Sequence, residues 1–536
     1  MAICAAALSA CSGGGGGGGP SGTSPDGGVT DGGVNADGGT EADGGTSAGG
    51  GTDAGGGTGA GGGTDAGGGT GAGGGTDAGS DGGTDGGTTV ATPGGGDWTQ
   101  YRAGVRGDSE NVGAFDASQA ANLRTIWTAE LSPNGTAQAV SQPMIVGGTA
   151  YFTTAVSANV LALDMATGAV RWSRQFDRDV TTNCGGVKHR GFWAAPAVVG
   201  GVLYLAAPDG HAYALHPEDG TTIWASAIAD PSAAGHGEFL QSSPAVSTAL
   251  GRVYLGIASS EGCDEVRGKI AMLDIATGAA TVKPLLAEGQ QGATIWSSIS
   301  IDESARLVFA STGNRIGDIS AEPLAQAIVS FDADTLAVAD HWQDPTPLLD
   351  SDFGSSPTLF DDGGTPLVAA ANKDGMLFVL RRDRLSAGPV WSFRLAVTDA
   401  TKPTISGDPS SRFGSIVSPT FAHGLLYAAG GRTPAGEPGS VVAFAAGTGA
   451  VQWKHTTPGY VLAPMPAVGD LLIVESSAPD NSTSWLEVLD AHSGALLRTF
   501  PGKLATFAAP AVAHGVVLWV DAAGTVTALA PPLFVP

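Results

Sequence analysis

The chain has 536 residues, with 25 Lys or Arg against 51 Asp or Glu, so its formal net charge at pH 7 is −26. A chain this acidic is not expected to hold nucleic acid through phosphate contacts. Its sequence has no run of about 20 apolar residues of the kind that predicts a transmembrane helix. Four cysteines in a chain of this length also exclude a scaffold built on disulfides.

The first eleven residues, MAICAAALSAC, form a short apolar run that ends in Leu8-Ser9-Ala10-Cys11. This ending resembles the lipobox of bacterial lipoproteins, in which the signal peptide is cut before the cysteine and the thiol is lipidated. The resemblance implies a signal peptide over residues 1–10, a lipid anchor on Cys11 and a folded part in the periplasm or at the cell surface. The run is short and has no basic residues ahead of it, so an accidental cysteine beside a flexible tail is the alternative.

Residues 11–96 have the composition of a flexible linker. Of the 86 glycines in the chain, 41 lie between residues 12 and 96, together with ten acidic residues and no Lys or Arg. The unit GGGTDAGGGTGA occurs at 49–60 and again at 61–72, and no apolar side chain in the segment is larger than Val. Such a segment cannot form a core, and it suits the tether of an anchored domain.

The remaining residues, 97–536, contain eight copies of a short alternating apolar strand. The copies are VLALD (160–164), AYALH (212–216), IAMLD (270–274), IVSFD (328–332), LFVLR (377–381), VVAFA (441–445), LEVLD (486–490) and VTALA (526–530). Most copies are followed by a turn and a strand that bears a tryptophan, as in ATGAVRW at 166–172. The turn has a glycine where a hairpin needs positive φ, at Gly168, Gly220, Gly278, Gly449 and Gly494.

A repeat of about 50 residues with four short strands is typical of a propeller blade. We therefore predict an all-β fold, an eight-bladed β-propeller over residues 97–536. The eighth copy has no tryptophan strand after it, whereas LRTIWTAEL at 123–131 looks like a tryptophan strand with no copy before it. We expect this N-terminal strand to complete the last blade and to close the ring.

The pattern ALD-x-x-TG-x-x-x-W resembles the repeats of the quinoprotein dehydrogenases that use pyrroloquinoline quinone (PQQ), which are periplasmic eight-bladed propellers of bacteria. The resemblance covers nearly all of residues 97–536 and looks closest to the polyvinyl-alcohol dehydrogenases. Non-catalytic propellers share the repeat, including the lipoprotein that scaffolds outer-membrane barrel assembly. Evidence for function therefore has to come from the residues between the repeats.

A PQQ site needs an aromatic slab for the flat ring, cations for the carboxylates, a divalent metal and a base for the alcohol proton. The segment TIWSSISIDESARLVFASTGN at 294–314 resembles the family segment that supplies the slab and one metal ligand. The resemblance implies that Trp296 stacks on the cofactor and that Asn314 gives its side-chain oxygen to calcium. A tryptophan that only packs a blade is the alternative for Trp296.

The first cation comes from NCGGVKHRGFW at 183–193. This segment resembles the family segment in which an arginine follows two adjacent cysteines, which makes Arg190 the predicted ligand of a PQQ carboxylate. Cys184 matches the first of these cysteines, but Gly185 stands in place of the second. Cys184 either pairs with Cys263 or both thiols are free.

The base and the second cation come from two further segments. LLDSDFGSSPTLF at 348–360 resembles the family segment with the catalytic carboxylate, and Asp352 takes its place, with Asp350 as the rival. Asp352 would accept the alcohol proton and also contact the calcium. In AANKDGMLFVL at 370–380, Lys373 matches the family cation that reaches the quinone oxygens. A turn-capping Asp and a solvated Lys are the alternatives.

The last metal ligand is a glutamate in IASSEGCDEVRGKIAMLD at 257–274. This segment resembles a family segment in which a glutamate that binds calcium precedes an Arg-Gly pair. Glu261 is the predicted ligand, while Glu265 or an ordinary surface position stays open.

The sequence thus predicts an enzyme that oxidises an alcohol to a carbonyl compound with PQQ and calcium. Because it shows no CxxCH motif for a haem, the electrons are expected to pass to a separate acceptor, a cytochrome or a quinone. The alternative is a non-catalytic propeller that serves as an envelope assembly or binding scaffold.

Overall fold

The computed structural model describes residues 96–111, 117–131, 141–177, 179–181, 188–232, 237–259, 266–317, 320–399 and 413–532. The predicted signal peptide with Cys11, nearly all of the linker, and Cys184, Glu261, Cys263 and Glu265 lie outside these ranges, as does the side chain of Arg190. Within the ranges there are two short helices, α2 (Ala117–Ala120) and η3 (Leu385–Ala387). Neither is long and apolar enough to cross a membrane.

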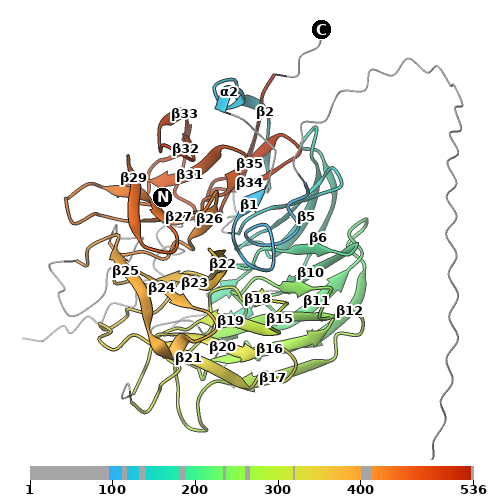
Figure 1. Cartoon of the computed structure of the whole chain (residues 1–536). Helices are drawn as coiled ribbons and strands as arrows, with labels where there is room; N and C mark the ends of the chain where they lie inside the picture. The colour runs from blue at the N-terminus through green and yellow to red at the C-terminus, as the bar shows by residue number, and fades with distance from the viewer. Residues whose placement is uncertain are drawn as a thin grey trace, which may run out of the picture. The chain divides into compact units, whose positions relative to one another are not determined.

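Most strands of residues 117–532 form eight sheets, which are arranged as the blades of a propeller (Figure 1). Each blade has four antiparallel strands that follow one another from an inner to an outer position. This arrangement confirms the predicted eight-bladed, all-β fold. The blades are numbered here in chain order from the one that begins at Met144.

Blade 1 contains β3 (Met144–Val146), β4 (Thr149–Thr153), β5 (Asn159–Asp164) and β6 (Val170–Gln175). Blade 2 contains β9 (Ala197–Val199), β10 (Val202–Ala206), β11 (His211–Leu215) and β12 (Thr222–Ala227). Blade 3 contains β14 (Ala245–Ser247), β15 (Arg252–Ser259), β16 (Lys269–Asp274) and β17 (Ala280–Pro284). Blade 4 contains β18 (Ser300–Asp302), β19 (Leu307–Ser311), β20 (Ala327–Asp332) and β21 (Val338–Gln343).

Blade 5 contains β22 (Thr358–Asp362), β23 (Thr365–Ala371), β24 (Met376–Arg381) and β25 (Pro389–Arg394). Blade 6 contains β26 (Thr420–Ala422), β27 (Leu425–Gly430), β28 (Gly439–Ala445) and β29 (Ala450–Thr457). Blade 7 contains β30 (Ala467–Val468), β31 (Leu471–Ser477), β32 (Ser484–Asp490) and β33 (Leu496–Gly502). Blade 8 contains β34 (Ala511–Ala513), β35 (Val516–Val520), β36 (Thr525–Ala530) and β2 (Arg124–Glu130).

Four short strands lie outside this pattern. β13 (Glu238–Phe239) pairs with β15, and β1 (Glu110–Asn111) runs parallel to β30. β7 (Asp179–Thr181) and β8 (Lys188–Arg190) form a separate two-stranded ribbon.

All eight predicted repeats lie in the third strand of a blade, and the repeat joins neighbouring blades. The outer-strand Trp127 packs on Gly168 of the next blade, where an added Cβ would lie 2.6 Å from the indole ring. All five predicted turn glycines have φ between 71° and 73°, and they meet Trp127, Trp172, Trp224, Trp391 and Trp453 in the same way. Each of these indoles donates to a backbone carbonyl of the next blade at 2.9–3.2 Å. Glycine is needed both for the left-handed backbone and for the ring.

The ring closes as the sequence predicts. β2, near the N-terminal end of the propeller, pairs antiparallel with β36, near its C-terminal end, and so becomes the outer strand of blade 8. The tryptophan of β2 is Trp127, which then docks on blade 1. The strand pairing therefore joins the two ends of the propeller within blade 8, and the tryptophan contact spans the junction between blade 8 and blade 1.

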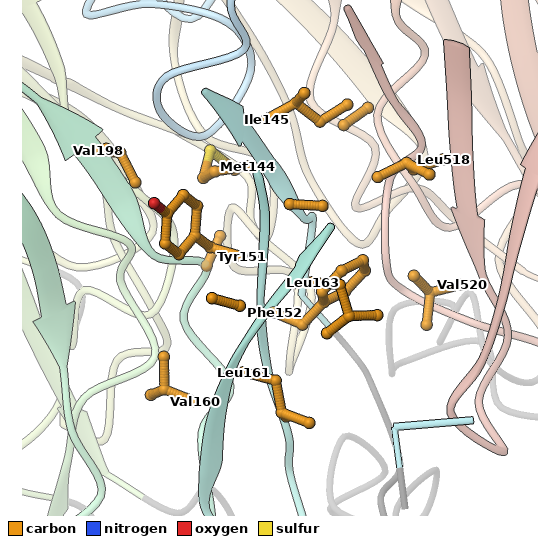
Figure 2. Packing of buried hydrophobic residues seen from close by; sticks show 14 of the residues in the cluster. Met144, Ile145, Tyr151, Phe152, Val160, Leu161, Leu163, Val198, Leu518 and Val520 are labelled. Atoms are coloured by element: carbon orange, nitrogen blue, oxygen red, sulfur yellow. The ribbon is translucent and has the colours of Figure 1, made fainter. Parts of the chain in front are cut away.

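The apolar core lies between the faces of adjacent blades. Figure 2 shows one such cluster, in which Phe152 and Leu163 of blade 1 lie between Val198 of blade 2 and Leu518 and Val520 of blade 8. Burying one side chain of this size contributes about 1.5–3 kcal/mol. Contacts between blades therefore hold the ring together, because each sheet alone would leave both faces exposed.

The segment that precedes the blades, residues 98–111, makes contact with every one of them. Main-chain or side-chain hydrogen bonds join it to the inner strands in order, from blade 1 to blade 8: Ile145, Val198, Val246, Ile301, Leu359, Phe421, Ala467 and Val512. We call this segment the N-terminal ring. Its Arg102 is buried, and the guanidinium donates to Ser356 O, Pro357 O, Ser300 Oγ and Thr358 Oγ1.

Candidate functional site

Four of the predicted site residues, together with Asp350, lie on loops of the adjacent blades 4 and 5. Trp296 precedes the inner strand β18, and Asn314 follows the second strand β19. Asp350 and Asp352 precede the inner strand β22, and Lys373 follows the second strand β23. Because the first two strands of a blade are antiparallel, a residue before one and a residue after the other emerge at the same end. The topology thus brings these five residues together.

Asp352 is the centre of this cluster and is completely buried. The indole Nε1 of Trp296 donates to its Oδ2 at 2.7 Å, and Nζ of Lys373 lies 2.9 Å from its Oδ1. The backbone N–H of Lys373 donates to the Asp352 carbonyl at 3.0 Å. The same Nζ is 5.4 Å from the centre of the Trp296 ring. The predicted slab and the predicted cation therefore both hold the predicted base.

Asp350, the rival for the base, lies on the other side of Lys373. Its Oδ1 accepts hydrogen bonds from Nζ of Lys373 at 2.9 Å and from Nδ2 of Asn314 at 2.8 Å. The backbone of Asp350 has φ 61°, in the left-handed region that few residues other than glycine adopt. The bond to Nδ2 fixes the Asn314 amide so that its oxygen is the atom that can face a cation.

The chemistry of this cluster fits a hard cation and an aromatic cofactor in part. Two carboxylates and one ammonium group give it a formal charge of −1, and its oxygen donors are those that calcium prefers. Within the described ranges, no group of three or more His, Cys, Asp or Glu is placed to hold a metal. Calcium would therefore use Asn314, Asp350 and Asp352 together with oxygens from elsewhere, and the predicted Glu261 lies outside the described residues.

Gly354 allows the Trp296 ring to lie where it does. A Cβ added to Gly354 would lie 2.5 Å from Cη2 of Trp296 and 2.5 Å from Cγ2 of Ile416. In the motif Asp352-Phe353-Gly354, the carboxylate of Asp352 thus accepts the indole N–H, and the missing side chain of Gly354 leaves room for the six-membered ring of the indole. Phe353 is itself buried, and its N–H donates to the carbonyl of Thr312 at 3.2 Å. This bond ties the loop of blade 5 to blade 4.

A cavity of about 120 Å³ adjoins the same tryptophan. Its apolar lining includes Trp193, Trp296, Ile416 and Phe507, and its polar lining is mainly serine and glutamine. Tyr101 of the N-terminal ring also lines it. Among the described residues, the carboxylates, Lys373 and Asn314 do not line this cavity, so Trp296 belongs to both the charged cluster and the cavity.

Serines in the walls join successive blades by a series of hydrogen bonds. The N–H of Ala195 donates to Ser243 Oγ, and the N–H of Ser243 donates to Ser298 Oγ. The N–H of Ser298 then donates to Ser356 Oγ, and the N–H of Ser356 donates to Ser418 Oγ. The bonds measure 2.8–3.0 Å. They fix the starts of the inner strands of blades 2 to 6. Trp296 and Asp352 lie shortly before two of these strands, β18 and β22.

The structure places the other predicted residues less fully. The backbone of Arg190 ends β8, and its role stays a prediction because its side chain lies outside the described part. Sequence reasoning missed Gln326, which is buried and whose Nε2 lies 3.5 Å from Asn314 Oδ1 and 3.3 Å from Ser351 Oγ. Gln326 lies outside every repeat. Its positive φ of 49° could not be predicted either, because the residue is not a glycine.

Comparison with known proteins gives the following. The family model described as outer membrane protein assembly factor BamB, PQQ_2, matches residues 108–347 and 367–532. Polyvinylalcohol dehydrogenase of Sphingopyxis sp. (strain 113P3) is 25% identical over 337 residues, which are 54% of this chain and 48% of that protein. The dehydrogenase subunit of the quinone alcohol dehydrogenase of Gluconacetobacter polyoxogenes is 26% identical over 318 residues, 50% of this chain and 41% of that protein.

Among solved structures, the quinohemoprotein alcohol dehydrogenase of Comamonas testosteroni superposes with a TM-score of 0.61 at 19% identity. The superposition covers 83% of this chain and 81% of that one. At this identity the likeness shows the shared propeller fold. The chain spans about half the length, or less, of the curated relatives that it matches.

Proposed function

The chain belongs to the PQQ_2 family, and from this premise we propose that it oxidises an alcohol to a carbonyl compound with PQQ and calcium. The observation that carries the proposal is the buried Asp352, held between Trp296 at 2.7 Å and Lys373 at 2.9 Å. A buried carboxylate costs stability unless it is paired, and the partners of Asp352 are an aromatic ring and a cation of the kinds that a PQQ site requires. The two curated relatives, both alcohol dehydrogenases by name, support the same reading.

The residues divide the work as follows. When bound, PQQ supplies a quinone that accepts the hydride of the alcohol carbon. Asp352 takes the hydroxyl proton, because its carboxylate is the base nearest to the tryptophan slab. Lys373 balances the charge of the carboxylate and presents its ammonium group over the indole face. Trp296 offers its face for stacking and keeps Asp352 in place through Nε1.

Calcium would be held by the amide oxygen of Asn314 and by the carboxylates of Asp350 and Asp352. The ion would add to the positive charge that Lys373 places beside these carboxylates. Arg190 and Glu261 are proposed to complete the cofactor and metal sites. Electrons would pass to a separate cytochrome or quinone.

The experiment is a thermal melt of the purified chain with PQQ and Ca²⁺. A ligand that binds only the folded state at a hundredfold excess over Kd stabilises it by about 2.7 kcal/mol, so the melting temperature should rise. Asp352→Asn should keep this rise and lose alcohol-dependent dye reduction by about 10²–10⁴-fold. Asp334→Asn, whose carboxylate pairs with Arg306 on the surface, is the control and should keep both. A wild-type chain with no rise at any calcium concentration would contradict the proposal.

The second candidate is a non-catalytic envelope assembly or binding scaffold. The description of the matched family favours it, because BamB is named as an assembly factor. A scaffold would show no shift with PQQ and no dye reduction, whereas an enzyme should show both.

We further propose that the chain is a lipoprotein of the cell envelope, anchored through Cys11. The support is the sequence Leu8-Ser9-Ala10-Cys11 and the glycine-rich segment behind it. Cys11→Ala should move the protein from the membrane fraction to the soluble fraction, while Cys263→Ala should leave it in place. Equal membrane association of the Cys11 variant and the wild type would exclude the anchor.

A further inference from the structure

A second cavity, of about 170 Å³, lies between blades 7 and 8 and shares no lining residue with the one beside Trp296. Its floor is the face of blade 8, where side chains that share a face form two rows across the strands. The first row is Trp519, Thr527 and Thr128, and the second is Asp521, Thr525 and Glu130. The end of the outer strand of blade 7, residues 501–503, forms the other wall.

The space exists because blade 7 lacks a side chain that other blades have. In blades 1, 2, 5 and 8, an apolar residue four positions after the docking tryptophan is buried in the cluster between that blade and the next one: Phe176, Ile228, Leu395 and Leu131. In blade 7, Arg498 has the strand register of the docking tryptophan, and Gly502 follows four positions later. A Cβ at Gly502 would lie 2.3 Å from Cη2 of Trp519. The glycine thus lets Trp519 approach and leaves the rest of the space open.

The indole N–H of Trp519 has no acceptor in the described part of the chain. Trp519 is 4% exposed, and its Nε1 is buried and forms no hydrogen bond there. Buried polar groups are normally hydrogen-bonded, and a buried N–H that stays unpaired costs stability. Because Trp519 forms part of the cavity floor, a ligand in the cavity can supply the missing acceptor.

The carboxylates of the floor lack donors in the same cavity. Asp521 is 6% exposed, and its Oδ1 accepts hydrogen bonds from the N–H groups of Ala523 and Thr525, both at 3.0 Å. No described residue donates to its Oδ2. Burial raises the pKa of this carboxyl, and the neighbouring Glu130 raises it further, so its charge is only partly compensated. Glu130 itself accepts from the hydroxyl of Thr525 at 3.1 Å.

We propose that the cavity between blades 7 and 8 binds a small polyol. A hydroxyl group can accept from the N–H of Trp519 and donate to the carboxylate of Asp521, and a polyol has one for each. An inorganic anion would meet two carboxylates, Glu130 and Asp521, against the single charge of Lys503. An amine would leave the indole N–H without an acceptor.

The size of the cavity limits the ligand. A cavity of about 150 Å³ holds benzene, so one of about 170 Å³ suits about six to eight non-hydrogen atoms, as in polyols of three or four carbons. The inference goes beyond the proposed function and depends neither on PQQ nor on the reaction.

The test is a titration of the full chain, without cofactor, with erythritol, followed by saturation-transfer NMR of the ligand. The wild type should bind with a Kd on the order of 1 mM, within the affinity per atom of small ligands. Glycine, methanesulfonate and methylammonium serve as zwitterionic, anionic and cationic probes, and each should bind at least tenfold more weakly. Comparable or tighter binding of any of them, or no saturable binding of erythritol, would overturn the proposal.

The variant Asp521→Asn locates the bound polyol. Asn372 has the equivalent place in the corresponding turn of blade 5, where its Oδ1 accepts the N–H of Met376 at 3.1 Å, so an asparagine at 521 should keep the turn folded. Because the variant loses the charge and one acceptor, erythritol should bind about tenfold or more weakly. Asp480→Asn, in the corresponding turn of blade 7, lies outside the cavity lining and should keep the wild-type Kd. Equal binding by all three proteins would refute the site.

A second variant tests the other row of the floor. Thr527 lies between Trp519 and Thr128 on the face of blade 8, and Thr527→Val removes its hydroxyl at nearly constant volume. The Kd for erythritol should rise about three- to tenfold, as for the loss of one neutral hydrogen bond. A wild-type Kd in this variant would also contradict the proposal.

Discussion

The indole N–H of Trp296 donates to the buried carboxylate of Asp352 at 2.7 Å, although the two residues are 56 positions apart and belong to different blades. The residue proposed to stack on the cofactor thus also positions the residue proposed to take the proton. Loss of the ring and loss of the N–H should therefore have different effects.

Trp296→Phe keeps an aromatic face and removes the donor. We expect the PQQ-dependent rise in melting temperature to be largely kept, and kcat for alcohol oxidation to fall about 10–100-fold, because a hydrogen bond to a charged group contributes about 1.5–3 kcal/mol. Trp296→Ala should lose the rise as well. Melting curves and dye assays on both variants provide the measurement. Equal behaviour of the two variants would argue against a separate role for Nε1.

Removal of Lys373 should destabilise the protein more than removal of a surface lysine. Lys373→Met leaves the buried Asp352 without its counter-charge, which should cost about 3–5 kcal/mol of unfolding free energy in urea. Adding Asp352→Asn to this variant should recover part of the loss, since position 352 would then carry no charge and only the less deeply buried Asp350 would lack its counter-charge. The control is Lys454→Met, which breaks the partly exposed Lys454–Glu437 pair and should cost about 0–1 kcal/mol. A double variant no more stable than the single one would contradict the pairing argument.

Arg102 should be the main stabilising residue of the N-terminal ring. Burial lowers the pKa of its guanidinium to about 10, so it stays charged at neutral pH and holds oxygens of blades 4 and 5. Arg102→Met should lower the unfolding free energy by about 2–4 kcal/mol, because several buried acceptors lose their donor. Arg106→Met, which breaks a half-exposed pair with Asp361, should cost about 0–1 kcal/mol. Comparable losses for the two variants would refute this role.

Glu475 of β31 should make stability depend on pH. Its side chain is completely buried, only Ser477 Oγ donates to it among the described residues, and burial raises its pKa from 4.5 to about 8. Between these values the unfolded chain releases a proton that the folded chain keeps, so stability falls as pH rises from about 4.5 to about 8. Glu475→Gln should remove this fall, which amounts to a few kcal/mol, in urea melts across that range. Glu437→Gln, whose pKa is lowered by Lys454, should keep the fall.

The blades were predictable from the sequence because the same glycine in each turn has to meet two structural requirements. The turn glycine that meets Trp127 needs positive φ and no side chain, so it recurs at a fixed distance from the next tryptophan. The closure of the ring was predictable because the tryptophan strand at 123–131 has no repeat copy before it, whereas the eighth copy has no tryptophan strand after it. The N-terminal ring was not predictable, because its contacts are mainly backbone hydrogen bonds that any residue can make.

The candidate site was predictable only as residue types. The resemblance supplied Trp296, Asn314, Asp352 and Lys373, and the fold brings them together. The resemblance could not supply their contacts. For example, Asn314 and Lys373 both donate to Asp350, whose left-handed backbone is not evident from the sequence. Nor could it supply Gln326, which links the two loops through bonds to a backbone carbonyl and two side chains.

The N-terminal ring imposes an order on the folding of the chain. Residues 98–111 leave the ribosome before any blade exists, yet their partners are spread over all eight inner strands, the last of which is made some 400 residues later. The first segment of the propeller to be synthesised is thus the last that can be placed. Its contacts can therefore be completed only after the inner strand of blade 8 has been made, and from then on no blade can leave the ring without breaking a hydrogen bond to this segment.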